Sequence, residues 1–304
     1  MTVLPNDQLT VRVGCKLTYE AARETTLLLA VQPHIDLGQT LLAESLLLGA
    51  GLAAEPLRNQ HGVRVLRLKL PPGRTEIVHD ALVSVPPVYD LDGVRLTAAV
   101  APEQLSGDLL RYIQPSRFCE SDRLGTFAWQ TFGSFAPGWP RVQAVTGWIR
   151  REIGYRLGPE QAEQSAWDLF QRRHGGDRGL AHLAIALFRA LNLPARYATG
   201  HLPDIGCLDP GMDKGFHAYA EVYLGGLWFP IEARGSEPRL GRIKISHGCD
   251  AVDCAVGTTF GPVTLSLFEV WAYQVEAGTV TVGDPIDLAK RLDGGLEVRV
   301  KLNA

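Results

Sequence analysis

The stretch RRHGGDRGLAHLAIALFRALNLPARYATGHL, residues 172–202, decides the fold class, because a glycine pair, a helical pattern and an extended run follow one another in it. From Leu180 to Leu191, apolar residues recur at i, i+3, i+4, i+7, i+8 and i+11. This spacing predicts an amphipathic helix that opens at Asp177. The run ARYATGHL, residues 195–202, predicts a strand directly after the helix. The order favours an α+β protein in which a helix packs on a sheet.

Two runs further along the chain, HAYAEVYL (217–224) and LWFPIEA (227–233), alternate around a Gly-Gly pair and predict a β-hairpin. In this register His217 and Glu232 are diagonal neighbours on one face, with backbones roughly 7 to 8 Å apart. A histidine oriented by an acid on an adjacent strand is two thirds of a catalytic triad. An ordinary cross-strand polar pair has the same pattern, so both interpretations stay open.

The pattern changes near residue 115, which predicts two parts. Residues 1–115 hold several strand-like runs bounded by prolines, such as VRVLRLKL at 63–70, and predict a β-sandwich-like region. Residues 116–304 predict the α+β core. Within the core we expect helices near 142–153 and 164–173, and strands in the runs TLSLFEVWAYQV, TVTVG and LEVRVKLN near the C-terminus.

Composition excludes several classes of protein. The 304 residues are 46% hydrophobic and 21% charged, which is enough to close a core and rules out disorder as the main state. Thirty basic against thirty-three acidic residues give a net charge of −3, so neither nucleic acid nor an anionic membrane is an expected partner. The most apolar run, residues 40–57, contains Glu44 and Glu55 and is a poor membrane span.

Cysteine usage bears on the compartment. The five cysteines are scattered, odd in number and without a Cys-x-x-Cys motif, which indicates reduced thiols and argues against a disulfide framework or a structural zinc site. Residues 1–7 have no basic or apolar signal region. We therefore expect a cytoplasmic protein.

Taken together, the motif order resembles the bacterial transglutaminase-like superfamily, which has a papain-like core behind an N-terminal β-rich region. Members carry three segments. The first is Gly-Val-Cys-Arg-Asp-Phe-Ala-His-Leu, the second is His-Ala-Trp-Ala-Glu-Val, and the third is a Trp followed four residues later by Asp-Pro-Thr. The run HAYAEV places the family's catalytic histidine at His217, and WFPIEARG places its catalytic aspartate at Glu232. The resemblance covers nearly the whole chain and implies the fold.

The first family segment departs from the pattern at its functional residue. It reads GGDRGLAHL here, so Asp177 stands where the family has its nucleophilic cysteine, and Gly179 replaces the acid two residues later. The asparagine after Asp-Pro-Thr is also absent, with Gly235 in its place. A carboxylate at a helix N-terminus is stabilised by the helix dipole but is a weak nucleophile, so transamidation through a thioester is not expected.

Three functional hypotheses remain. In the first, Asp177, His217 and Glu232 form a non-thiol catalytic site of a hydrolase, with Asp177 as general base or carboxylate nucleophile on an amide, peptide or glycosidic-type bond. Asp177 as a simple N-cap is the competing explanation. In the second hypothesis the three residues bind a divalent metal ion, with further ligands from a set made up of His201, Asp204, Asp209, Asp213 and His247.

The third hypothesis is a catalytically inactive transglutaminase-like fold that binds a peptide or a partner protein. If the protein is an enzyme, we expect its substrate to be an amide, a peptide or a saccharide. No cofactor is expected, apart from the divalent metal ion of the second hypothesis. Four residues near the predicted site are candidates for substrate binding, namely Arg178, Tyr219, Trp228 and His201.

Overall fold

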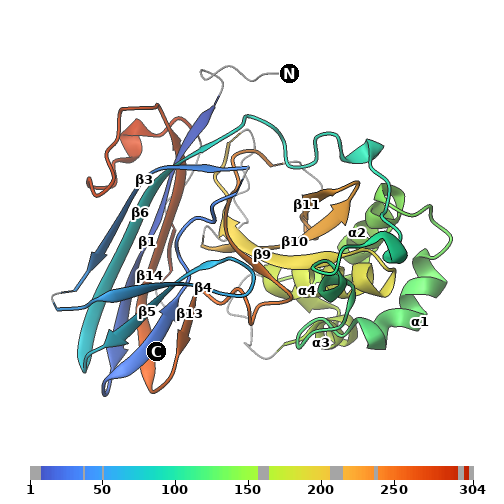
Figure 1. Cartoon of the computed structure of the whole chain (residues 1–304), viewed down its shortest axis with the longest axis horizontal. Helices are drawn as coiled ribbons and strands as arrows, with labels where there is room; N and C mark the ends of the chain where they lie inside the picture. The colour runs from blue at the N-terminus through green and yellow to red at the C-terminus, as the bar shows by residue number, and fades with distance from the viewer. Residues whose placement is uncertain are drawn as a thin grey trace.

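The structure of the chain is a computed structural model. It describes residues 8–36, 38–49, 51–156, 164–205, 215–235 and 239–293, together with the backbone of residues 298–300. Two antiparallel sheets pack on one side of a helical core, and a third sheet lies within that core (Figure 1). The predicted α+β class is confirmed.

The first two sheets form the β-sandwich. The larger sheet has the order β15-β14-β1-β6-β3, with bounds Val298–Val300 (β15), Val263–Val275 (β14), Leu9–Ala21 (β1), Gly73–Val85 (β6) and Thr40–Leu48 (β3). The smaller has the order β13-β2-β5-β4, with bounds Gly257–Thr259 (β13), Thr25–Leu29 (β2), Arg64–Leu70 (β5) and Ala54–Arg58 (β4). Alternating apolar residues of β1, β2 and β5 meet in one buried cluster, which holds the two sheets together.

The C-terminal strands depart from the division at residue 115. Strand β14 pairs with β1 from Val263 opposite Ala21 to Val275 opposite Thr10, and β13 pairs with β2. The expected place of the run TLSLFEVWAYQV in the core was therefore wrong, and the run TVTVG, residues 279–283, forms no strand. A run such as TLSLFEVWAYQV predicts a strand but carries no information about which strand it joins, because pairing depends on distant residues.

The core packs helices on a four-stranded sheet of order β11-β10-β9-β12, with bounds Leu227–Ile231 (β11), His217–Leu224 (β10), Ala195–His201 (β9) and Ile243–Gly248 (β12). Its helices are Ser121–Phe132 (α1), Trp139–Glu152 (α2), Ala166–Arg172 (α3) and Asp177–Ala190 (α4). A two-residue parallel pair joins Gly154–Tyr155 (β7) to His174–Gly175 (β8). Short 3-10 helices are Val94–Leu96 (η2), Pro102–Gln104 (η3), Leu110–Ile113 (η4) and Leu288–Lys290 (η5).

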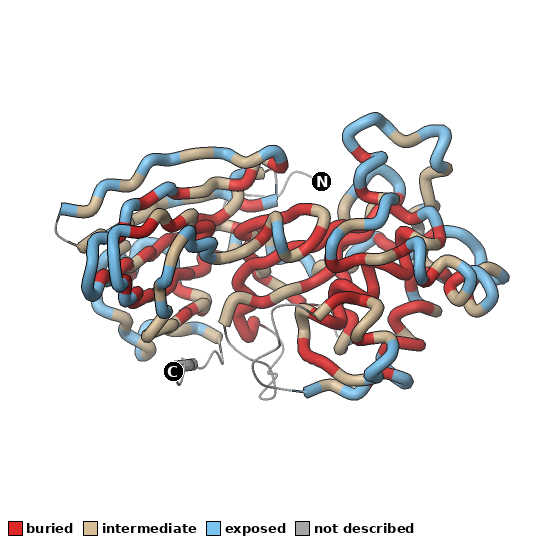
Figure 2. The backbone as a smooth tube through the Cα atoms, turned by 90° about the horizontal axis from the view of Figure 1, so that it is seen from below, coloured by how far each residue is buried: buried red, intermediate tan, exposed pale blue. Residues whose placement is uncertain are grey.

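Helix α4 is the centre of this core. It contacts α1, α2 and α3 as well as β9 and β10, and its residues 179–189 are all buried. Figure 2 shows that the buried backbone concentrates in the interior of the molecule. The predicted apolar stripe is therefore one side of a helix that neighbouring elements bury on all sides. This packing fixes the position of the N-terminus of α4 relative to the sheet.

The hairpin has the predicted register. Leu224 lies opposite Leu227, and Ala220 lies opposite Ile231. Gly225 and Gly226 have φ values of 56° and 91°, the left-handed region that a two-residue turn of this kind requires. Strand β11 ends at Ile231, and Glu232 follows it directly. The Glu232 carboxylate therefore lies at the end of β11, beside β10.

Candidate functional site

Asp177 is the first residue of α4. Gly176 is the N-cap residue, so Asp177 occupies the first helical position and is not the cap. The Asp177 carboxylate instead faces β10, where its Oδ2 lies 3.4 Å from Nδ1 of His217. The N-cap explanation of Asp177 is therefore wrong, and the helix N-terminus adds a favourable dipole to an acid that points at a histidine.

His217 lies between two carboxylates. Its Nε2 is 2.8 Å from Oε2 and 3.0 Å from Oε1 of Glu232, while Nδ1 faces Asp177. Only 2% of the His217 side chain is exposed. Burial alone would lower the pKa of His217, but Glu232 and Asp177 together raise it to about 9. At neutral pH the ring is an imidazolium between two negative charges.

Arg242 and Asp90 extend this row of charges. Arg242 Nη2 lies 2.5 Å from Oε1 of Glu232 and 2.8 Å from Oδ2 of Asp90, and its guanidinium stacks 4.2 Å above the ring of Tyr219. Burial raises the pKa of Glu232, yet His217 and Arg242 hold it well below its usual range. Burial raises the pKa of Asp90 despite the attraction of Arg242.

Sequence reasoning missed Arg242 and Asp90. Arg242 directly precedes β12 and Asp90 lies in the connection after β6, so neither is near the family motifs in the sequence. No spacing or periodicity relates them to Glu232, because only the tertiary fold brings the three together. Their function here is to orient the carboxylate that in turn orients His217.

The space beside Asp177 is small. A pocket of about 10 Å³ is lined by Asp177, Leu180, Tyr219 and Glu232 among others, which is room for about one water molecule. A larger pocket of about 450 Å³ lies on the other side of Glu232. Charged and aromatic side chains line it, including Asp90, Trp139, Arg150 and Arg239.

The four candidate substrate-binding residues lie in different places. Tyr219 is buried in the site, with its ring 6.1 Å from that of His217. The guanidinium of Arg178 lies 4.8 Å from the Phe118 ring. Trp228 and His201 lie elsewhere: Trp228 stacks on Arg196 at 4.1 Å, and His201 packs 5.0 Å from Phe216. Burial lowers the pKa of His201 to about 3.

Comparisons with known proteins place these residues in a family. A family model described as the transglutaminase-like superfamily matches residues 131–233, which include Asp177, His217 and Glu232. A crystal structure from Cytophaga hutchinsonii, named as a "Putative Cysteine Protease", is 30% identical and superposes with a TM-score of 0.78 over 90% of this chain and 93% of that one. The chain belongs to the transglutaminase-like superfamily.

Two weaker similarities are also found for this superfamily member. An uncharacterised protein of Mycobacterium leprae is 25% identical over 116 residues, 38% of this chain, and the match spans 42% of that relative's length. The periplasmic domain of TgpA from Pseudomonas aeruginosa is 17% identical, with a TM-score of 0.38 over 75% of this chain and 88% of that one. Among the described residues of this transglutaminase-like chain, no helix is long and apolar enough to cross a membrane.

The metal hypothesis for the three site residues gains no further ligand from the described part of this transglutaminase-like chain. His201 lies against Phe216, and His247 packs 4.9 Å from His34. Asp204 lies near Arg239, at 3.5 Å. Asp209 and Asp213 lie outside the described residues. A different group of described side chains, His61, Cys249 and Asp253, has the spacing of metal ligands and lies in another part of the fold.

Proposed function

We propose that this transglutaminase-like protein is a hydrolase whose catalytic residues are Asp177, His217 and Glu232, with no thiol. The observation that carries the proposal is the buried ring of His217 between two carboxylates, one of them at the N-terminus of α4. In a thiol member the corresponding pair is thiolate and imidazolium. Here the carboxyl group of Asp177 takes the place of the thiol.

The geometry suits general acid and base catalysis. Asp177 takes a proton from a water molecule, and the water oxygen attacks the carbonyl carbon of an amide or peptide. His217 donates its proton to the leaving nitrogen as the carbon–nitrogen bond breaks, and then recovers the proton held by Asp177. Glu232, oriented by Arg242, stabilises the imidazolium before the transfer. The pocket of about 10 Å³ at Asp177 has room for the one water that this step needs.

The described cysteines do not supply a substitute nucleophile. Burial raises the pKa of Cys15 and of Cys119 to about 12, and it raises that of Cys249 and Cys254 as well. None of these four thiols lies at the N-terminus of α4. Cys207 lies outside the described residues. The proposed substrates are amides, peptides or bonds of glycosidic type, all of which water can cleave with an acid and a base in place.

A second candidate is a non-catalytic protein that binds a peptide or partner. The observation in its favour is the contrast in size between the pocket of about 10 Å³ at Asp177 and that of about 450 Å³ beyond Glu232. A peptide side chain fits the larger pocket without touching Asp177. We further propose a cytoplasmic location, since the four described cysteines are all free thiols.

The test is hydrolysis by the full chain of chromogenic amide, peptide and glycoside substrates. Asp177→Asn and His217→Gln should each lower kcat at least 100-fold, the usual contribution of a general base or acid. The matched control is Asp122→Asn, an exposed acid in the first turn of α1, which should leave kcat unchanged. Activity should also fall as pH rises through about 9, where His217 loses its proton.

Two outcomes would contradict the catalytic proposal. Full activity of either variant would remove Asp177 or His217 from the mechanism. Absence of turnover on every substrate class, combined with measurable binding of peptides that substitutions at Trp139 or Arg239 weaken, would favour the second candidate.

A further inference from the structure

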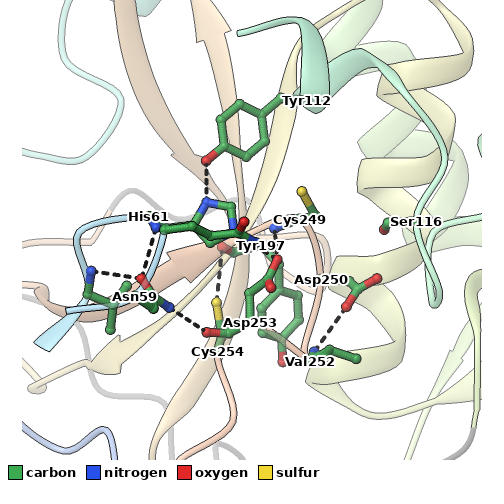
Figure 3. A network of polar contacts seen from close by, with 12 residues as sticks. Asn59, His61, Tyr112, Ser116, Tyr197, Cys249, Asp250, Val252, Asp253 and Cys254 are labelled. Atoms are coloured by element: carbon green, nitrogen blue, oxygen red, sulfur yellow. Dashed lines mark hydrogen bonds and ion pairs between the residues drawn. The ribbon is translucent and has the colours of Figure 1, made fainter. Parts of the chain in front are cut away.

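A second cluster of reactive side chains lies outside the proposed catalytic site. His61 comes from the connection between β4 and β5, and Cys249 and Asp253 come from the loop after β12 (Figure 3). One ligand atom of each residue lies within 4.8 Å of those of the other two. Among the described residues, these three side chains form the group of His, Cys, Asp or Glu residues whose ligand atoms lie close enough together to hold one metal ion.

The cluster is separate from the catalytic residues. On β9, Tyr197 pairs with Gly248, which precedes the cluster loop, whereas Gly200 pairs with His217. Three strand residues span about 10 Å. The function of the cluster is therefore independent of the hydrolase proposal.

Hydrogen bonds converge on Asp253. Its Oδ2 lies 3.0 Å from Nε2 of His61 and accepts a bond of 2.7 Å from the backbone N–H of Cys249. Burial would raise the pKa of Asp253, but the bonds from His61 and Cys249 hold it below its usual value. Nδ1 of His61 lies 3.0 Å from the Tyr112 hydroxyl (Figure 3).

The backbone around the cluster is held from outside. The Asn59 side-chain oxygen accepts bonds from the backbone N–H groups of His61 and Val63, at 2.9 and 3.0 Å. Arg189 donates to the carbonyl of Cys249 at 2.7 Å, and Ala251 N–H donates to Nε2 of His182 at 3.2 Å. Side chains carried by a backbone fixed in this way are preorganised for a ligand.

A catalytic cysteine pair does not explain the cluster. The ring nitrogens of His61 face Asp253 and Tyr112, so neither of them is paired with the Cys249 thiol. A cation bound at the cluster would hold Cys249 as a thiolate, because a coordinated thiol is deprotonated.

We propose that His61, Cys249 and Asp253 bind one zinc ion, with a water molecule as the fourth ligand. Zinc is the divalent ion that takes thiolate, imidazole and carboxylate together in tetrahedral geometry. Tetrahedral ligands at zinc bond lengths lie about 3.5 Å apart, so atoms already within 4.8 Å reach them by small side-chain rotations.

The protons balance through Tyr112. In the neutral tautomer that donates Nε2–H to Asp253, Nδ1 of His61 accepts from the Tyr112 hydroxyl when no metal is bound. When zinc binds, the ring changes tautomer: Nδ1–H donates to the Tyr112 oxygen, and Nε2 gives its lone pair to the ion. Cys249 loses its thiol proton to solvent, so one proton is released for each zinc bound.

Zinc binding has a structural consequence. His61 belongs to the sandwich, while Cys249 and Asp253 follow the last strand of the core sheet, so the ion joins these two parts of the molecule. A pocket of about 290 Å³ reaches one of the three ligands, because Asp253 is part of its lining. The metal-bound chain should therefore unfold at a higher temperature than the chelator-treated chain.

The experiment is cobalt substitution of the full chain after dialysis against a chelator. Cobalt should bind at one equivalent and give the near-ultraviolet charge-transfer band of a cobalt–thiolate bond, and one equivalent of zinc should remove that band. Binding of zinc in weak buffer should release one proton per chain. Absence of the band in the wild type would overturn the proposal.

Variants locate the site. Cys249→Ser should abolish the band, and His61→Gln and Asp253→Asn should weaken cobalt binding at least 100-fold. Tyr112→Phe should weaken it by about 10-fold, the scale of an outer ligand contact. The matched control is Cys254→Ser, a buried cysteine in the same loop whose Sγ contacts the Tyr197 carbonyl at 3.7 Å, and it should retain the band. A band that persists in Cys249→Ser, or that disappears in Cys254→Ser, would overturn the assignment.

Discussion

The charge on His217 makes the stability of the protein depend on pH in a defined window. The pKa of His217 is about 9 in the folded chain, against an ordinary value of 6.5. Below pH 6.5 both folded and unfolded chains hold the proton, and the stabilisation by Glu232 and Asp177 is fully present. Between 6.5 and 9 only the folded chain holds it, so the free energy of unfolding falls as pH rises.

The size of this effect follows from one proton. A difference of one proton changes the free energy of unfolding by about 1.4 kcal/mol per pH unit, so stability should fall by about 2 kcal/mol between pH 7 and 8.5. Four other histidines have lowered pKa values in the folded chain, namely His34, His182, His201 and His247, and comparison with a variant that keeps all four cancels their contribution.

The assay is urea unfolding of the full chain at pH 7.0 and 8.5, with His217→Gln as the reference. Ionisation of unfolded thiols near pH 8.5 affects both chains equally, because the cysteines are the same. The wild type should lose about 2 kcal/mol more than the variant over this interval. Equal losses in the two chains would refute the account of His217 as a shared, buried imidazolium.

Three substitutions test other parts of the account. Asp177→Cys should create a thiol that iodoacetamide alkylates faster than the buried native thiols, since the helix N-terminus and the imidazolium beside it lower the thiol pKa; labelling no faster than in the parent chain would show that the pair is not poised. Arg242→Met should lower the free energy of unfolding by about 3–5 kcal/mol in urea unfolding, because it leaves the buried carboxylates of Glu232 and Asp90 without their partner, and a loss under about 1 kcal/mol would contradict this. Gly200→Ala would bring a Cβ to the carbonyl oxygen of Ile243, so thermal unfolding should report a loss of about 1–3 kcal/mol, and an unchanged Tm would contradict the close strand approach.

Local patterns were sufficient to predict the elements that carry the site. The spacing from Leu180 to Leu191 predicts α4, and the Gly-Gly pair predicts the hairpin register that brings His217 and Glu232 together. Both are short-range properties: a helix period and a two-residue turn each constrain neighbours in the sequence.

The remaining features depend on contacts between distant segments. Arg242 and Asp90 meet Glu232 only because β12 and the connection after β6 pack beside the hairpin. The pairing of β14 with β1 is likewise non-local. Trp228 and His201 stay candidates for substrate binding, and their packing on Arg196 and Phe216 is also a contact between distant segments that local patterns do not predict.

The central claim is that a charged imidazole shared by two carboxylates replaces the thiolate and imidazolium of the family. Its most direct test is a pH titration of the ¹⁵N-labelled full chain by NMR, observing the ring nitrogens of His217. The account predicts that both nitrogens carry protons at pH 7.5 and that the ring titrates with a pKa of about 9. A ring that is neutral at pH 7.5 would contradict it.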